Sequence, residues 1–275
     1  MIHVANGASA AAADTLAAAG SAPSPLWYAT RGTGVVALVL LTISVALGVA
    51  GTARFSSTAM PRLVRSGLHR NVSMMSVGFV AAHVLTVVLD PFASIHLTSA
   101  IIPFSSRYRT FWLSLGTIAF DLLLALILTS VLRTRLGYRS WRGVHWLAYA
   151  SWPIALWHGL GTGTDSRVPW LLLLDALCVL AVGASVFWRI RLVRPTRKRI
   201  AGLVATASIA VATVAFVAIG PLQPGWARRA GTPGDLLGSA RPAAAAISPN
   251  ATHPSEPNVL AANRPEAVTP KGGAG

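Results

Sequence analysis

The chain has 275 residues, of which 53% are hydrophobic and 11% charged, and this balance excludes a soluble globular protein of ordinary composition. The formal net charge of +15 does not predict nucleic acid binding, because the arginines fall in short loops between apolar runs and do not gather on one soluble face. The single cysteine, Cys178, lies inside an apolar run, which excludes a disulfide framework, a CxxC zinc site and a CxxCH attachment for a covalent heme. The composition therefore predicts a polytopic membrane protein that binds no nucleic acid.

The apolar runs predict an all-α fold, a six-transmembrane-helix bundle between disordered tails. A bilayer core about 30 Å thick requires roughly 20 helical residues at about 1.5 Å each. Residues 1–26 are rich in Ala, Gly and Ser and lack the features of a signal peptide, so we expect a flexible tail. Residues 27–220 form the membrane domain, and the Pro- and Ala-rich residues 221–275 are expected to be a second disordered tail. The expected spans are 34–51, 69–90, 111–132, 144–163, 170–188 and 200–220.

The distribution of charge between the loops predicts the orientation in the plasma membrane. The loops after the first, third and fifth spans hold most of the arginines, and the positive-inside rule places these loops in the cytoplasm. The alternate loops hold only Arg107 and Arg109 in one and Arg167, balanced by Asp165, in the other. Both termini are therefore expected outside the cytoplasm.

Two of the spans carry paired histidines, His69 and His83 in the second and His145 and His158 in the fourth. Ionisable side chains inside a bilayer are costly and mark functional sites. Both spans run outward, so His69 and His145 should lie near the cytoplasmic face and the other two near the outer face. Imidazole is a good ligand for iron, and two axial imidazoles favour electron transfer over oxygen binding. The pattern predicts two non-covalent b-type hemes, an inner one between His69 and His145 and an outer one between His83 and His158.

Helix periodicity supports this pairing in one span only. The step of 14 from His69 to His83 rises about 21 Å and returns to within about 40° of the same face. The step of 13 from His145 to His158 misses the same face by about 140°. Pro153 lies between these two residues and can kink the helix. For each histidine alone, a hydrogen bond between helices or an interfacial position is the alternative.

The spacing of the histidines resembles that of the ferric reductase-like transmembrane domain. This family includes NADPH oxidases, iron reductases and the heme subunit of bacterial methionine sulfoxide reductase systems, and it carries H-x13-H in one span and H-x12-H two spans later. The resemblance covers residues 27–194 and implies that electrons enter on the cytoplasmic side, pass from inner to outer heme and reduce an acceptor outside. Supporting pieces are Arg31-Gly32, Ile102-Pro103-Phe104, Tyr108, Leu136-Gly137-Tyr138, Trp141, His158-Gly159, Gly163 and Asp165.

Two departures narrow what the resemblance implies. The oxidases and iron reductases continue into a cytoplasmic flavin and nicotinamide domain, whereas we expect this chain to continue as an outer tail with no flavin domain. Its electrons would then come from a separate cytoplasmic or membrane donor, a flavin reductase or a quinol. The oxidases also carry a further histidine one turn after the outer ligand, where this chain has Val87, so superoxide production is disfavoured.

Arginines are the candidates for binding the heme propionates, because guanidinium pairs well with carboxylate. Arg31, at the outer end of the first span, is the candidate for the outer heme, as the resemblance also implies. The candidates for the inner heme are Arg54, Arg70 and Arg142. The alternative for each is a positive charge at the lipid headgroups that only sets the orientation of the spans.

Three further residues lie within the spans, between the levels of the histidines. Phe79 and Trp152 are candidates for an electronic bridge between the hemes, with plain packing as the alternative. Asp121 lies near the middle of the third span, where an acid costs at least ~2.5 kcal/mol, so it is expected to bond a helix partner or to move protons.

Together these observations predict the heme-carrying membrane subunit of an oxidoreductase, with no catalytic residue of its own. The expected acceptor is a flavin-binding protein, a methionine sulfoxide reductase or a ferric chelate, and the residues do not distinguish these. A cofactor-free, proton-coupled transporter that uses the four histidines and Asp121 as a relay is the alternative from another class. A membrane anchor with purely structural heme is a third hypothesis.

Overall fold

The computed structural model describes residues 24–52, 62–91, 95–163, 167–191 and 197–239, and within these ranges all regular structure is helical. Among the described residues, five helices are long and apolar enough to cross a membrane. They are α2 (Pro25–Thr52), α3 (Arg62–Leu89), α5 (Thr110–Val131), α8 (Pro169–Arg191) and α9 (Arg197–Ile219). The chain is thus an all-helical polytopic membrane protein, and these five helices overlap five of the six expected spans.

The remaining expected span, 144–163, is divided between two helices, α6 (Arg133–His145) and α7 (Ala148–Thr162). The 15 residues of α7 rise about 22 Å, less than a bilayer core of about 30 Å, which explains why α7 alone falls short of a full span. Between α6 and α7 the backbone turns through Trp146 and Leu147. The Leu147 N–H donates to the Val144 carbonyl at 2.8 Å, a bond to the third preceding residue that is typical of a 3₁₀ turn. The His145 and His158 side chains therefore come from different helical segments.

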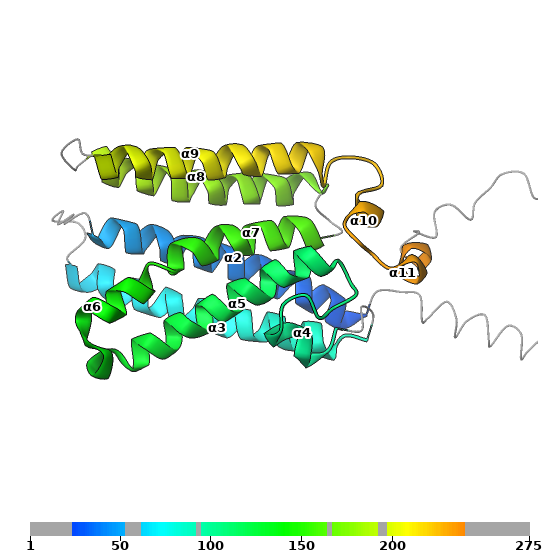
Figure 1. Cartoon of the computed structure of the whole chain (residues 1–275), viewed down its shortest axis with the longest axis horizontal. Coiled ribbons are helices and arrows are strands. Elements are labelled where there is room, and N and C mark those ends of the chain that lie inside the picture. Colours follow the sequence, from blue (N-terminus) through cyan, green and yellow to red (C-terminus); the bar gives the residue numbers. More distant parts are fainter. Residues whose placement is uncertain (1–23, 53–61, 92–94, 164–166, 192–196, 240–275) are drawn as a thin grey trace, which may run out of the picture. The chain divides into compact units, whose positions relative to one another are not determined.

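The helices pack mainly in neighbouring pairs, as Figure 1 shows. Helix α3 runs along α2, α7 along α5 and α9 along α8, while α2 also contacts α7 and α8. Two polar contacts fix α2 against its neighbours. The hydroxyls of Ser44 and Ser73 lie 2.7 Å apart between α2 and α3, and Trp152 Nε1 on α7 donates to Thr42 Oγ1 at 2.9 Å. Because α2 contacts α3 and α7, which carry three of the four membrane histidines, it can set the relative heights of these two helices.

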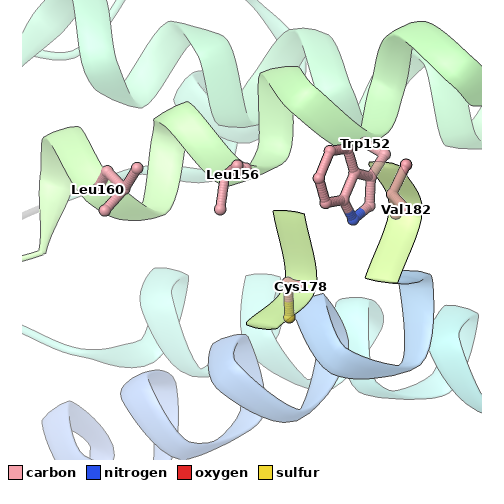
Figure 2. Close-up of a cluster of buried hydrophobic side chains, with 5 residues drawn as sticks. All are labelled: Trp152, Leu156, Leu160, Cys178 and Val182. Atoms are coloured by element: carbon pink, nitrogen blue, oxygen red, sulfur yellow. The ribbon is translucent and has the colours of Figure 1, made fainter. Parts of the chain in front are cut away.

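The buried apolar cluster lies between α7 and α8 (Figure 2). Trp152, Leu156 and Leu160 come from α7, and Cys178 and Val182 from α8. Many apolar side chains elsewhere are exposed, as expected when lipid is the surrounding solvent. The cluster fixes the inward face of α7, and with it the position of His158 along the bundle.

The C-terminal part of the chain corrects one prediction, because residues after 220 do not all form a disordered tail. Residues 220–232, named here the C-terminal cap, include α10 (Trp226–Arg229), and α11 (Gly234–Ser239) follows. The Arg109 N–H donates to the Gly231 carbonyl at 3.0 Å, and Arg109 Nε donates to Thr232 Oγ1 at 2.9 Å. These contacts, together with the packing of the Trp226 ring against Trp112 and Phe216, anchor the cap, which the composition of the segment did not suggest. Residues 240–275 lie outside the described residues.

At the other end of the chain, the first helix begins at Pro25, inside the stretch that we expected to be a tail. Ser24 Oγ donates to Asp90 Oδ1 at 2.9 Å, which joins the start of α2 to the end of α3. Helix α3 ends at Leu89, directly before Asp90-Pro91, where the residue before proline disfavours helical backbone. Residues 1–23 lie outside the described residues.

Candidate functional site

The structure brings the four membrane histidines together in two pairs. The rings of His69 on α3 and His145 at the end of α6 have centroids 6.5 Å apart, with planes inclined by 80°. The rings of His83 on α3 and His158 on α7 have centroids 6.3 Å apart, with planes inclined by 79°. We name these the inner and the outer pair, after the sides of the membrane on which the sequence predicts them. The inner pair thus joins α3 to α6, and the outer pair joins α3 to α7.

The separation within each pair suits two axial ligands on one metal atom. A metal–imidazole bond is about 2 Å long and the ring centre lies roughly 1 Å beyond the nitrogen, so two axial imidazoles place their centres about 6 Å apart. Both measured separations agree with this value. A direct hydrogen bond between two imidazoles does not require such similar geometry at both levels. The distances therefore fit a heme between the rings of each pair.

Three of the four rings are fixed by backbone carbonyls. Nδ1 of His69 lies 3.0 Å from the Ser44 carbonyl, and Nδ1 of His83 lies 2.8 Å from the Thr30 carbonyl, both on α2. Nδ1 of His158 lies 2.9 Å from the Trp112 carbonyl on α5. A carbonyl can only accept, so each Nδ1 carries the hydrogen and donates it. In the neutral ring Nε2 then bears the lone pair, which is the state of a metal-binding imidazole.

His145 differs from the other three histidines. Its Nδ1 is buried and has no hydrogen-bond partner among the described residues. Its ring stacks instead on Trp141 of the same helix, with centroids 4.9 Å apart and planes inclined by 26°. The inner pair is therefore fixed by a carbonyl on one side only.

The candidate arginines differ in how close they lie to a histidine pair. Arg31 directly follows Thr30, whose carbonyl binds His83, and its guanidinium carbon lies 3.4 Å from the centre of the Trp27 ring. Arg31 thus lies at the level of the outer pair. Arg70 follows His69 on α3 and Arg142 lies one turn before His145, and both side chains are exposed. Arg54 lies outside the described residues.

The other residues singled out in the spans occupy different settings. Trp152 is 4% exposed, belongs to the buried cluster and bonds Thr42, so its contacts are those of a packing residue. Phe79 on α3 and Asp121 on α5 are half-buried. Asp121 has no hydrogen bond or ion pair within the part of the chain that the structure describes, so it forms no polar relay with the histidines there.

Within the described ranges, no group of three or more His, Cys, Asp or Glu side chains gathers as a metal site. A heme is compatible with this arrangement, because the macrocycle supplies the equatorial ligands and the protein supplies only the axial ones. The residues present therefore fit heme better than a bare metal ion.

Fold and site define a polytopic helical membrane domain that holds two pairs of facing imidazoles at two levels. Residues 33–156 match the family model of the ferric reductase like transmembrane component, the family that the spacing of the histidines resembles. The match contains His69, His83 and His145 and ends two residues before His158. Comparisons with curated proteins and with solved structures give no match. The match indicates transmembrane electron transfer in general terms.

Proposed function

We propose that the chain moves electrons across the plasma membrane through two b-type hemes, held by His69 with His145 and by His83 with His158. The observation that carries this proposal is the pair of nearly equal ring separations, 6.5 and 6.3 Å, each with nearly perpendicular ring planes. When bound, a heme with two axial imidazoles supplies a one-electron couple and leaves no open position on the iron. The site is thus suited to electron transfer between partners.

The protein's own contribution is to hold each ring in one tautomer and one place. The carbonyls of Ser44, Thr30 and Trp112 keep Nδ1 protonated on three histidines, which leaves Nε2 available as the ligand. Hydrogen bonds of this kind also raise the basicity of the ligand nitrogen. His69 and His83 are 14 residues apart on α3, so they lie about 21 Å apart along the helix. This distance leaves room for two stacked macrocycles.

The electron donor belongs, in this proposal, on the cytoplasmic side beside the inner pair, and the acceptor outside beside the outer pair. A flavin reductase or a quinol would supply electrons, and a flavin-binding protein, a methionine sulfoxide reductase or a ferric chelate would accept them. The chain is then the membrane subunit of an oxidoreductase, with both termini outside the cytoplasm. The resemblance to the family and the charge of the loops support this arrangement.

The cofactor-free proton relay is the competing hypothesis, and the contacts of the histidines weigh against it. A relay needs ring nitrogens that exchange protons with water or with other titratable groups. Here three Nδ1 atoms are bound to backbone carbonyls, which cannot take up or release a proton at physiological pH. Asp121 has no polar contact with a histidine among the described residues.

The test is a dithionite-reduced minus oxidised visible spectrum of the detergent-purified, heme-supplied protein, with heme counted per chain as pyridine hemochrome. We expect two low-spin b-type hemes per chain that do not respond to carbon monoxide. The His83→Ala variant should lose the outer heme and keep the inner one. A folded, colourless wild-type protein would contradict the function, and a full heme complement in His83→Ala would contradict the pairing.

A further inference from the structure

Each of the three carbonyl-bound histidines lies against a glycine of the helix that carries the carbonyl. An ideal Cβ built on Gly34 would lie 3.0 Å from Cε1 and from Nδ1 of His83. One on Gly48 would lie 3.4 Å from Cε1 of His69, and one on Gly116 would lie 2.5 Å from Cε1 and from Nδ1 of His158. The side chain of any other residue would thus approach or overlap the imidazole ring.

Carbonyl and glycine are separated by the same number of residues in all three cases. Thr30 precedes Gly34, Ser44 precedes Gly48 and Trp112 precedes Gly116, each by four positions. In an α-helix the N–H of residue n+4 donates to the carbonyl of residue n, so the carbonyl already has one donor. The histidine Nδ1–H is a second donor to the same oxygen, and it approaches from the side that the side chain of residue n+4 would cover. Glycine at n+4 leaves that side open.

We propose that these carbonyl and glycine combinations, named here histidine seats, position the axial ligands and fix their ring planes. Helix α2 carries two seats spaced by 14 residues, the same spacing as His69 and His83 on the antiparallel α3. Helix α5 carries the third seat, for His158. His145 has no seat, since its Nδ1 is without a partner among the described residues and its ring lies on Trp141. This proposal rests on the proposed function, because the seats matter through the heme that the rings hold.

Alanine substitutions with matched controls test the seats in the full chain. Gly116→Ala and Gly34→Ala place a methyl group against a ligand ring, whereas an ideal Cβ on Gly32 of α2 or Gly159 of α7 meets nothing within 4 Å. The readouts are heme per chain, the midpoint potentials and the low-spin EPR signal, which reports the angle between the two imidazole planes. Since alanine favours helix over glycine, a change caused by helix propensity alone would stabilise all four variants.

The expected effects follow the size of the overlap. Gly116→Ala should lose the outer heme, Gly34→Ala should keep it with a shifted outer potential and EPR signal, and Gly48→Ala should show the smallest change. Gly32→Ala and Gly159→Ala should match the wild type. If the wild type holds two hemes but Gly34→Ala and Gly116→Ala equal the controls, the seats are overturned and the proposed function stands. A wild type without heme overturns both.

A double substitution covers the case in which Gly116→Ala does not fold. In the His158→Ala chain the ring is absent, so adding Gly116→Ala should cost nothing in thermal stability or in membrane-inserted yield. If Gly116→Ala is as damaging there as in the wild type, the methyl group clashes with something other than the ligand ring, and the seat for His158 is overturned.

Discussion

Arg31 is the residue whose role the structure makes most specific. It follows the Thr30 carbonyl that binds His83, and its guanidinium lies over the Trp27 ring. A ferrous heme carries one positive charge less than a ferric heme, so a fixed positive charge near the outer pair favours the ferrous state. The guanidinium also offers hydrogen-bond donors to a propionate. Stacking on tryptophan holds the guanidinium in place.

Replacing Arg31 with Gln removes this charge while keeping a polar side chain of similar length. We expect the outer heme to become harder to reduce, so its midpoint potential should fall while the inner heme titrates as before. A spectroelectrochemical titration of wild type and Arg31→Gln measures both potentials, and Arg107→Gln, at an exposed position, serves as the control. If the midpoint potential of the outer heme is the same in wild type and Arg31→Gln, Arg31 does not contact a propionate of that heme.

At this scale the sequence predicted which histidines meet but not what holds them. The pairing followed from the order of the spans, and the structure brings the same rings together, although heme binding itself stays a proposal. The seats could have been found, because Gly34 and Gly48 repeat the 14-residue spacing of His69 and His83 on the preceding span. Their carbonyl partners could not, since no side chain at Thr30 or Ser44 signals a backbone contact.

At the scale of elements, the turn between α6 and α7 affects whether His145 and His158, 13 residues apart, lie on the same face of the expected fourth span. A 3₁₀ turn rotates the chain by about 120° per residue, compared with about 100° in an α-helix. The extra rotation through Trp146 and Leu147 moves His158 toward the face of His145 and reduces the mismatch of the 13-residue step. Pro153 lies farther along, inside α7, and is not where the two helices separate. The apolar pattern could not predict this turn, since the turn lies at the start of the apolar run, directly after the arginine-rich α6.

The C-terminal cap depends on Arg109, which is 1% exposed. Besides its bond to Thr232, the guanidinium donates through Nη1 to the Gly161 carbonyl at 2.9 Å and to the Gly163 carbonyl at 3.3 Å. Burial lowers the pKa of Arg109 and the neighbouring Tyr108 raises it, yet a guanidinium stays protonated in proteins. Arg109 thus joins the end of α7 to the cap, across 123 residues of sequence in the case of Thr232. Such a distant pairing explains why the sequence did not predict it.

Arg109→Lys should loosen the cap while leaving the transmembrane helices assembled. A lysine cannot bond Thr232 and the α7 carbonyls together, and each buried polar group left without a partner costs about 1–3 kcal/mol. We expect lower thermal stability and faster proteolytic cleavage after residue 220, with the heme content retained. Arg107→Lys, at an exposed position two residues earlier, is the control. Equal cleavage rates in the two variants would show that Arg109 does not hold the cap.

At the scale of the whole molecule, the membrane explains why the positions of the long helices could be predicted from the sequence and why some of their ends could not. Apolar runs of span length must become helices in a bilayer, because backbone groups find no water there. This is why α5, α8 and α9 begin and end within three residues of their expected bounds. Helix α2 begins nine residues earlier than its expected span, at Pro25, and α3 seven residues earlier, at Arg62, because helices extend past the apolar stretch into the interface. Hydropathy alone does not report those extensions.

Orientation is the property on which the direction of electron flow depends. The basic loops predict that α6 faces the cytoplasm and that the loop before α5 faces outward. Two exposed serines report on these two sides, Ser140 in α6 and Ser105 before α5. Cys178, the only native cysteine, is 4% exposed and can be replaced with alanine to give a chain without thiols.

In that chain, Ser105→Cys should react with a membrane-impermeant maleimide on intact cells or spheroplasts, whereas Ser140→Cys should react only after permeabilisation. The physical reason is that the reagent carries charge and does not cross the hydrocarbon core. Labelling of both positions in detergent is the control that each thiol is accessible. The opposite pattern would mean that the bundle has the reverse orientation. The pair of His69 and His145 would then lie on the outer side, and the pair of His83 and His158, near Arg31, would lie beside the cytoplasmic donor. Because the helices and the histidine pairs are the same in either orientation, this experiment decides the direction of transfer independently of heme binding.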